Sequence, residues 1–217
     1  MTTLEVGAKS EAGSVHPYED RMLVDEGSGL FAVADGVTVS SHGSGGAAAD
    51  LAIGLLPKAF SGDLPAAIGM VNRLSFEQRK EDRNIGETTL TAAFLHRGRL
   101  EVANVGDSPA VLIHHGTATS LIVEDRDRSG HITQVIGYRD GVSVHSTSLE
   151  LAAGDMVVLA SDGVGHVLGV PFLSRLALGA GAEEAAGSIV REAKAVPSGY
   201  DDDKTAIVLK VLGGGPR

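Results

Sequence analysis

The sequence predicts an α+β protein in which β-sheets form a sandwich and helices pack on its outside. About ten short apolar segments have strand-like patterns, and turn-like residues separate them. Glycine is frequent, with 29 in 217 residues, and scattered without a fixed period, as many tight turns require. Only three segments have helical periodicity, and two of them are consecutive. The length fits one domain over 1–217, with 213–217 as a frayed tail.

The strands follow from short apolar runs between turns. Residues 21–25 and 30–34 flank the turn Glu-Gly-Ser-Gly and predict a hairpin. Residues 88–95, 99–105 and 109–114 are separated by His-Arg-Gly and Gly-Asp-Ser, which predicts a meander. The remaining predicted strands are 4–9, 117–123, 142–148, 156–160 and 204–212.

The helices follow from spacing and from their ends. Residues 45–60 repeat alanine and leucine at helical spacing, and Pro57 is expected to end or kink this helix. A second helix is expected from Pro65 to about residue 80. A third, over 182–195, has acidic residues at its start and a lysine near its end, as the helix dipole favours. Residues 124–141 are charged and irregular.

The composition excludes several classes of function. The net charge is 18 − 28 = −10 and aromatic residues are 4%, which argues against nucleic-acid or anionic-membrane partners. Without cysteine there is no disulfide, thiolate metal site or cysteine nucleophile. No apolar stretch is long enough to span a membrane, and the N-terminus lacks the pattern of a signal peptide. We therefore expect a soluble cytoplasmic protein. We also expect a monomer.

Carboxylates recur where predicted strands begin or end. The acidic positions are Glu19-Asp20, Asp35, Asp107, Asp162 and the triplet Asp201 to Asp203. Each Asp-Gly pair alone is most simply a turn. As a set, strand-end carboxylates brought to one edge of a sandwich would repel one another unless they were protonated or bound a cation. Oxygen ligands favour Mg²⁺ or Mn²⁺ over Zn²⁺, so the pattern is consistent with a binuclear metal hydrolase.

Six motifs give this pattern a family resemblance. They are YED (18–20), FAVADG (31–36), GETT (86–89), VANVGDS (102–108), GDMVVLASDG (154–163) and DDDKT (201–205). Their order resembles the type 2C metal-dependent Ser/Thr protein phosphatases, the PPM family, over nearly the whole chain. The resemblance implies a four-layer αββα sandwich of two antiparallel sheets. It also implies two, and up to three, Mn²⁺ or Mg²⁺ ions and hydrolysis of phosphoserine or phosphothreonine by a metal-bridging water. The expected partner is a phosphoprotein, a Ser/Thr kinase or one of its targets.

The resemblance also implies roles for individual residues. The implied metal ligands are Asp35, which bridges both metals, the Gly36 carbonyl, Glu19, Asp162 and Asp202, with Asp107 and Asp162 holding a weaker third ion. Asp35 and Asp162 would thereby act in catalysis through the bridging water. Asp20 is expected behind the ligands, and Thr88 and Thr89 beneath the site.

The chain departs from the family pattern in its accessory groups. Val15 stands where the family has an arginine that grips phosphate, and we consider His16 as a replacement, although an ordinary surface histidine is the simpler interpretation. His42 lies in a Gly/Ser loop, where it is either a general acid or a solvent-facing side chain. Asp203 replaces the usual asparagine and is expected to add negative charge at the rim.

The segment 124–141 occupies the place of a variable flap in the family. Its Arg126 and Arg128 are candidates for contact with a phosphoprotein, against the default of a charged, solvated loop. The missing arginine leaves an alternative function open: a catalytically weak or inactive binding or regulatory module that keeps the fold.

Overall fold

Two five-stranded antiparallel sheets form the centre of the molecule. A computed structural model describes residues 3–37, 43–177, 179–197 and 199–213. Sheet A has the strand order β1-β10-β9-β6-β7, and sheet B has the order β2-β3-β4-β5-β8. The strands are β1 (Thr3–Glu11), β2 (Arg21–Asp25), β3 (Leu30–Ala34), β4 (Leu90–His96), β5 (Arg99–Val105), β6 (Ala110–His114), β7 (Thr117–Ser120), β8 (His145–Glu150), β9 (Met156–Ala160) and β10 (Lys204–Gly213).

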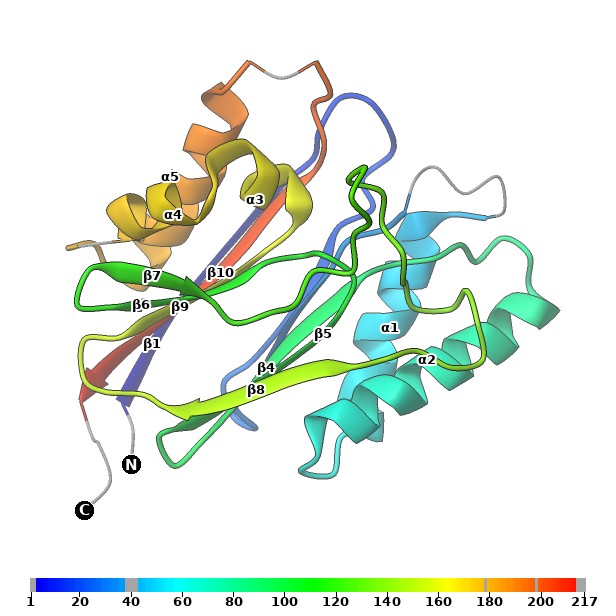
Figure 1. The fold of residues 1–217 in the computed structure, drawn as a ribbon, viewed down its shortest axis with the longest axis horizontal. Helices are drawn as coiled ribbons and strands as arrows, with labels where there is room; N and C mark the ends of the chain where they lie inside the picture. Colours follow the sequence, from blue (N-terminus) through cyan, green and yellow to red (C-terminus); the bar gives the residue numbers. More distant parts are fainter. Residues whose placement is uncertain (1–2, 38–42, 178, 198, 214–217) are drawn as a thin grey trace.

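Helices cover the outer face of each sheet, which gives four layers (Figure 1). Sheet B is covered by α1 (Gly45–Ala59) and α2 (Leu64–Glu81). Sheet A is covered by α3 (Asp162–Leu168), α4 (Val170–Ala177) and α5 (Ala182–Ala195). The predicted αββα sandwich is therefore confirmed.

The alternation of strand side chains builds a separate core in each gap between layers. In β9, Val157 and Leu159 pack between the two sheets, whereas Val158 and Ala160 pack toward the helices on sheet A. Both faces of this strand are buried, which explains its uninterrupted apolar sequence. The central strands are thus fixed on both sides, so their ends are rigid mounts for the residues that follow.

The element boundaries differ from the predictions in a few places. The strand predicted at 117–123 ends at Ser120, and the one predicted at 142–148 lies at His145–Glu150. Pro57 lies inside α1, which continues to Ala59. The predicted tail begins at Gly213, but this residue ends β10. Among the described residues, no helix is long and apolar enough to cross a membrane.

Candidate metal centre

Four of the predicted carboxylate ligands meet at one cavity. Asp35 follows β3, Asp107 follows β5, Asp162 follows β9 and Asp202 precedes β10, and all four line a cavity of about 550 Å³. Gly36 lines it as well. Carboxylates from distant parts of the sequence therefore share one space at the edge of the sandwich.

Asp35 is held firmly at the centre of this group. The Asp162 amide N–H donates to Asp35 Oδ2 at 3.2 Å. The Asp35 N–H donates to Thr89 Oγ1 at 3.0 Å, and the Thr88 hydroxyl donates to the Asp35 carbonyl at 2.9 Å. The structure thus confirms that both threonines bond beneath the site, where they fix the backbone of Asp35.

Glu19 and Gly36 lie against the start of α1. Glu19 Oε1 accepts from the Gly46 N–H at 3.1 Å, so its charge lies at the helix N-terminus, which favours an anion. A Cβ on Gly36 would lie 2.5 Å from the Gly45 carbonyl carbon and 2.7 Å from the Glu19 Cβ. Only glycine fits there, and it brings the backbone that follows Asp35 close to Glu19.

Asp20 lies behind the cavity and does not line it. It is 1% exposed, and its Oδ2 accepts from the Thr205 hydroxyl at 2.7 Å. Burial and the nearby carboxylates of Asp203 and Asp202 raise its pKa to about 7, although hydrogen bonds from Thr205 and Ser161 oppose this shift. This position agrees with the expected place of Asp20 behind the ligands.

The three aspartates before β10 have three different environments. Asp201 pairs with Lys204 Nζ at 2.7 Å, and Asp202 lines the cavity. The prediction that Asp203 adds charge at the rim is wrong, because Asp203 is 1% exposed. Its carboxylate accepts from the backbone N–H groups of Gly13 (2.7 Å), Glu19 (2.6 Å) and Asp20 (3.2 Å). Asp203 therefore ties the acidic pair to β10.

His16 contacts a predicted ligand instead of open solvent. Its Nε2 lies 2.7 Å from Asp202 Oδ1, and its Nδ1 lies 2.8 Å from the Pro17 carbonyl oxygen. Both partners are acceptors, which suits an imidazolium with two N–H donors. Burial lowers the pKa of His16, but the bonds to Pro17 and Asp202 outweigh it and raise that pKa. Since both ring nitrogens are engaged, the structure does not show His16 as a free phosphate-binding group.

The electrostatics of the cavity favour a cation. Burial, then the charges of Asp20, Asp162 and Asp202, raise the pKa of Asp35 well above its ordinary value. Burial and Asp162 likewise raise the pKa of Asp202. For Asp162, the opposing effect of burial is outweighed by His166, Asp35 and Arg126, and its pKa is lowered. An all-oxygen set of mutually repelling carboxylates fits hard divalent cations such as Mg²⁺ or Mn²⁺.

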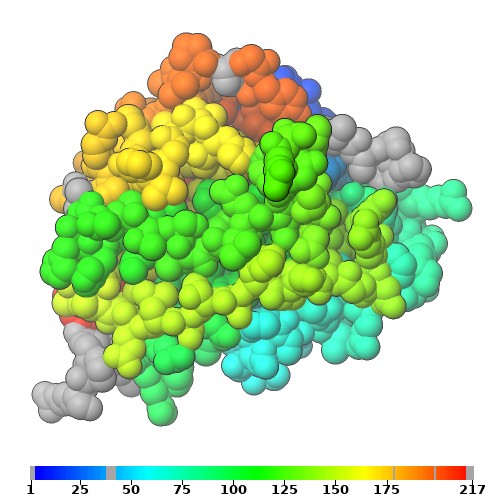
Figure 2. Space-filling view, in the orientation of Figure 1, coloured from blue at the N-terminus to red at the C-terminus, as the bar shows by residue number. Residues whose placement is uncertain are grey.

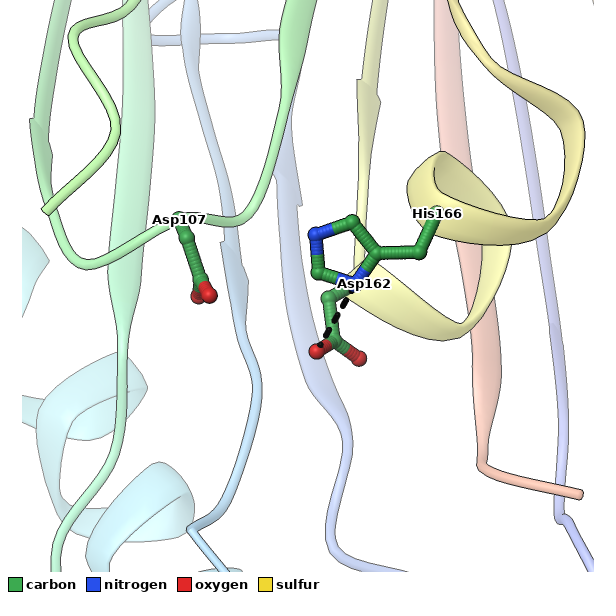
Figure 3. A group of neighbouring side chains, drawn as sticks. All are labelled: Asp107, Asp162 and His166. Carbon is green, nitrogen blue, oxygen red and sulfur yellow. Dashed lines mark ion pairs between the residues drawn. The ribbon is translucent and has the colours of Figure 1, made fainter. Parts of the chain in front are cut away.

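A second cluster, only part of which is predicted from the sequence, surrounds Asp107. Asp107, Asp162 and His166 offer ligand atoms within 4.8 Å of one another. Figure 3 shows Asp162 and His166 one turn apart on α3, with Asp107 facing them from the loop after β5. Arg126 joins this cluster: its Nε lies 2.5 Å from Asp107 Oδ2, and its Nη2 lies 3.2 Å from Asp162 Oδ2. His166 follows Asp162 by four residues, a spacing that places both on one face of a helix. The sequence could have indicated His166 only if a helix had been predicted here.

The remaining predicted site residues lie in different places relative to the cavity. Arg126 lines the cavity, whereas Arg128 is exposed and is not among the lining residues. His42 lies outside the described residues. Asp125 was missed: its buried carboxylate accepts from the Gly106 N–H (2.9 Å) and from Gln134 (2.7 Å), so it fixes the loop that carries Asp107.

Solved structures, among them PPM Ser/Thr phosphatases, share this fold. The chain matches PppA of Pseudomonas aeruginosa, described as a key regulatory component of T6SS, at 20% identity with a TM-score of 0.84, over 97% of this chain and 99% of that one. It matches the PPM Ser-Thr phosphatase MsPP of Mycobacterium smegmatis, in complex with cacodylate, at 23% identity and a TM-score of 0.82, over 98% and 100% of the two chains. It matches the catalytic domain of the serine threonine protein phosphatase PstP, in complex with two manganese ions, at 25% identity and a TM-score of 0.81, over 96% and 98%.

Sequence comparison assigns the family. No curated protein matches the chain. The family model described as stage II sporulation protein E (SpoIIE) matches residues 27–212 and so covers most of the chain. Together with a fold shared with PPM Ser/Thr phosphatases, this agrees with the motif-based resemblance. The chain belongs to the SpoIIE family and has the fold of the PPM phosphatases.

Proposed function

We propose that this chain is a metal-dependent phosphoprotein phosphatase that hydrolyses phosphoserine and phosphothreonine, with water as the nucleophile. The observation that supports this most is the convergence of Asp35, Asp162 and Asp202 on one cavity. In this cavity burial and mutual repulsion raise the pKa of Asp35 and Asp202. A fold shared with a phosphatase that binds two manganese ions adds support.

The residues that would hold two Mn²⁺ or Mg²⁺ ions come from four places in the chain. We assign the ligands to Glu19, Asp35, the Gly36 carbonyl, Asp162 and Asp202. When bound, such ions supply Lewis acidity toward phosphoryl oxygens and a water of lowered pKa. Asp20 and Asp203 support the ligands from behind, because Asp203 fixes the backbone of Glu19 and Asp20 bonds Thr205.

The loop that carries Arg126 is our candidate for the surface that meets the substrate. Arg126 lines the same cavity as the proposed ligands. Its guanidinium is held by Asp107, Asp162 and the Gly130 carbonyl, so we propose that the surrounding loop, and not the guanidinium itself, meets the phosphoprotein. Arg126 comes from the segment 124–141, which lies on the visible surface in green to yellow-green, next to the yellow helices (Figure 2). The substrate is therefore proposed to be a phosphoprotein that reaches this exposed face.

One observation favours a second function, that of a catalytically weak or inactive regulatory module. Val15 stands where the resemblance expects a phosphate-binding arginine, and its side chain is 45% exposed. His16 beside it is already engaged with Asp202. The retained carboxylates favour the enzyme. A cytoplasmic location, a monomeric state, a single domain and a link to a Ser/Thr kinase stay predictions.

Hydrolysis of a phosphothreonine peptide and of p-nitrophenyl phosphate tests the proposal. We expect turnover with Mn²⁺ or Mg²⁺, none in excess chelator, and a loss of at least roughly 100-fold in Asp35→Asn, because a metal ligand is removed. Asp155→Asn is a matched control, since Asp155 is also buried but pairs with His114 outside the cavity. Equal rates with Mn²⁺ and with chelator would contradict the enzyme, and metal binding without turnover would favour the regulatory module.

A further inference from the structure

Arg126 occupies the position where the sequence resemblance expects a third metal ion. That ion would be held by Asp107 and Asp162. In the structure the Arg126 guanidinium lies between these two carboxylates, 2.5 Å from Asp107 Oδ2 through Nε and 3.2 Å from Asp162 Oδ2 through Nη2. The Nε contact is an ion pair without hydrogen-bond alignment. A cation supplied by the chain thus already balances one of the two negative charges of this pair.

The loop that carries Arg126 is built to hold it in this place. Nη1 of Arg126 donates to the Gly130 carbonyl at 2.5 Å, and Arg126 forms an isolated β-bridge with Ile132. Asp127 Oδ1 caps the turn by accepting from the N–H groups of Ser129 (2.8 Å) and His131 (3.0 Å). These bonds lie within the loop and hold its turn together.

The base of the loop is fixed independently. The Asp125 N–H donates to the Gly106 carbonyl at 3.1 Å, and the Asp125 carboxylate accepts from the Gly106 N–H at 2.9 Å. Arg126 directly follows Asp125, and Asp107 directly follows Gly106. The guanidinium is therefore aimed at Asp107 by backbone bonds, and little side-chain entropy is lost when the ion pair forms.

A divalent ion and this guanidinium exclude each other. Mg²⁺ and similar divalent cations bind carboxylate oxygens at about 2.0–2.2 Å. Arg126 already contacts the Oδ2 atoms of Asp107 and Asp162 that such an ion would bind. Both species are cations, and an arginine keeps its charge at any working pH. Binding of a third ion would require Arg126 to leave.

We propose that Arg126 is the resident cation of this site and limits the protein to two divalent ions. The inference rests on the proposed function, because it presumes the two-ion site at Asp35. In this arrangement Asp107 holds Arg126 and does not bind a metal ion. Arg126 then acts as a positioning and charge-balancing residue that ties the surface loop to the catalytic cavity.

The stoichiometry of Mn²⁺ binding, measured by equilibrium dialysis at saturating Mn²⁺, tests the inference. We expect two ions per wild-type chain and three in Arg126→Gln, which removes the charge and keeps the side-chain length. Arg126→Lys, which keeps a cation, and Arg128→Gln, a matched neutralisation in the same loop, should each bind two. Arg126→Gln combined with Asp107→Asn should return to two, because a ligand of the third ion is lost.

The outcomes separate this inference from the proposed function. Three ions in the wild type, or two in Arg126→Gln, would overturn the role of Arg126 and leave the phosphatase proposal intact. A wild type that binds no Mn²⁺ would overturn both. Asp107→Asn alone gives a second test without altering the loop: we expect two ions as in wild type, whereas a fall in stoichiometry would show that Asp107 is a metal ligand.

Discussion

Neighbouring acidic residues of this chain have opposite physical roles. Asp203 is buried but satisfied by three backbone N–H donors, so its charge organises the segment that carries Glu19 and Asp20. Asp20 is equally buried, yet that burial, together with the nearby carboxylates of Asp203 and Asp202, raises its pKa to about 7. Sequence alone does not distinguish them, because the difference lies in which donors each carboxylate meets after folding.

The raised pKa of Asp20 predicts how stability depends on pH in the metal-free protein. Its folded pKa, about 7, lies above the ordinary value of 3.8, so the folded form binds more protons between these values and stability falls as pH rises through this window. Asp35 and Asp202 shift in the same direction. The raised pKa of His16 acts in the same direction. The stability that its protonated form contributes to the fold is lost as pH rises through the folded pKa.

We therefore expect a lower melting temperature in chelator at about pH 8 than at about pH 5. Between pH 5 and pH 8 Asp20 accounts for at most about 3 kcal/mol of the change in unfolding free energy, because in the folded state it loses its proton only near pH 7. Asp20→Asn should reduce the difference, because the amide does not titrate but still accepts from Thr205. Thermal unfolding by circular dichroism measures this, and a melting temperature that rises across the window would contradict the assignment.

At the scale of elements, the approach of β3 to α1 determines the shape of the cavity. Gly36 follows β3 and Gly45 begins α1, and each lies so close to the other that a Cβ would overlap backbone atoms. This contact places Glu19 next to the segment that carries Asp35. The metal centre therefore depends on the packing of two elements as well as on its ligands.

Gly36→Ala is expected to lower both stability and Mn²⁺ affinity, with a loss of stability of about 1–3 kcal/mol from overpacking. Gly54→Ala is the control, since Gly54 lies in α1 with no atom within 4 Å of an added Cβ. It should stabilise by up to about 1 kcal/mol, because alanine favours a helix. Chemical unfolding and Mn²⁺ titration of both variants check this, and an unaltered Gly36→Ala protein would contradict the packing argument.

Two elements could not be predicted from local sequence. The helix α3 contains Gly163 and Gly165, which disfavour helix in isolation. This helix forms because its tertiary contacts offset the low helix propensity of glycine. Val164 is fully buried on sheet A, and Gly165 lies so close to Pro109 that a Cβ would overlap it. The helix α4 follows at once and includes Pro171 near its start. Short helices of this kind depend on packing and not on propensity.

For the whole molecule, strand patterns and the order of the motifs were enough to predict the sandwich. Alternating or continuous apolar runs fix which face of each strand is buried, and the residues after those runs then lie at the strand ends. This explains why the sequence predicts Asp35, Asp162 and Asp202 at one edge of the sandwich, and in the structure all three line one cavity. Their partners could not be predicted, because Arg126 and His16 reach the site from irregular loops through contacts distant in sequence.

The dependence of thermal stability on Mn²⁺ tests the shared cation site most directly. Because a ligand that binds only the folded state raises stability with its concentration, the wild type should melt at progressively higher temperature as Mn²⁺ increases. Asp155→Asn should show the same increase, and Asp162→Asn little or none. An Mn²⁺-induced increase in Asp162→Asn equal to that of the wild type would contradict the account.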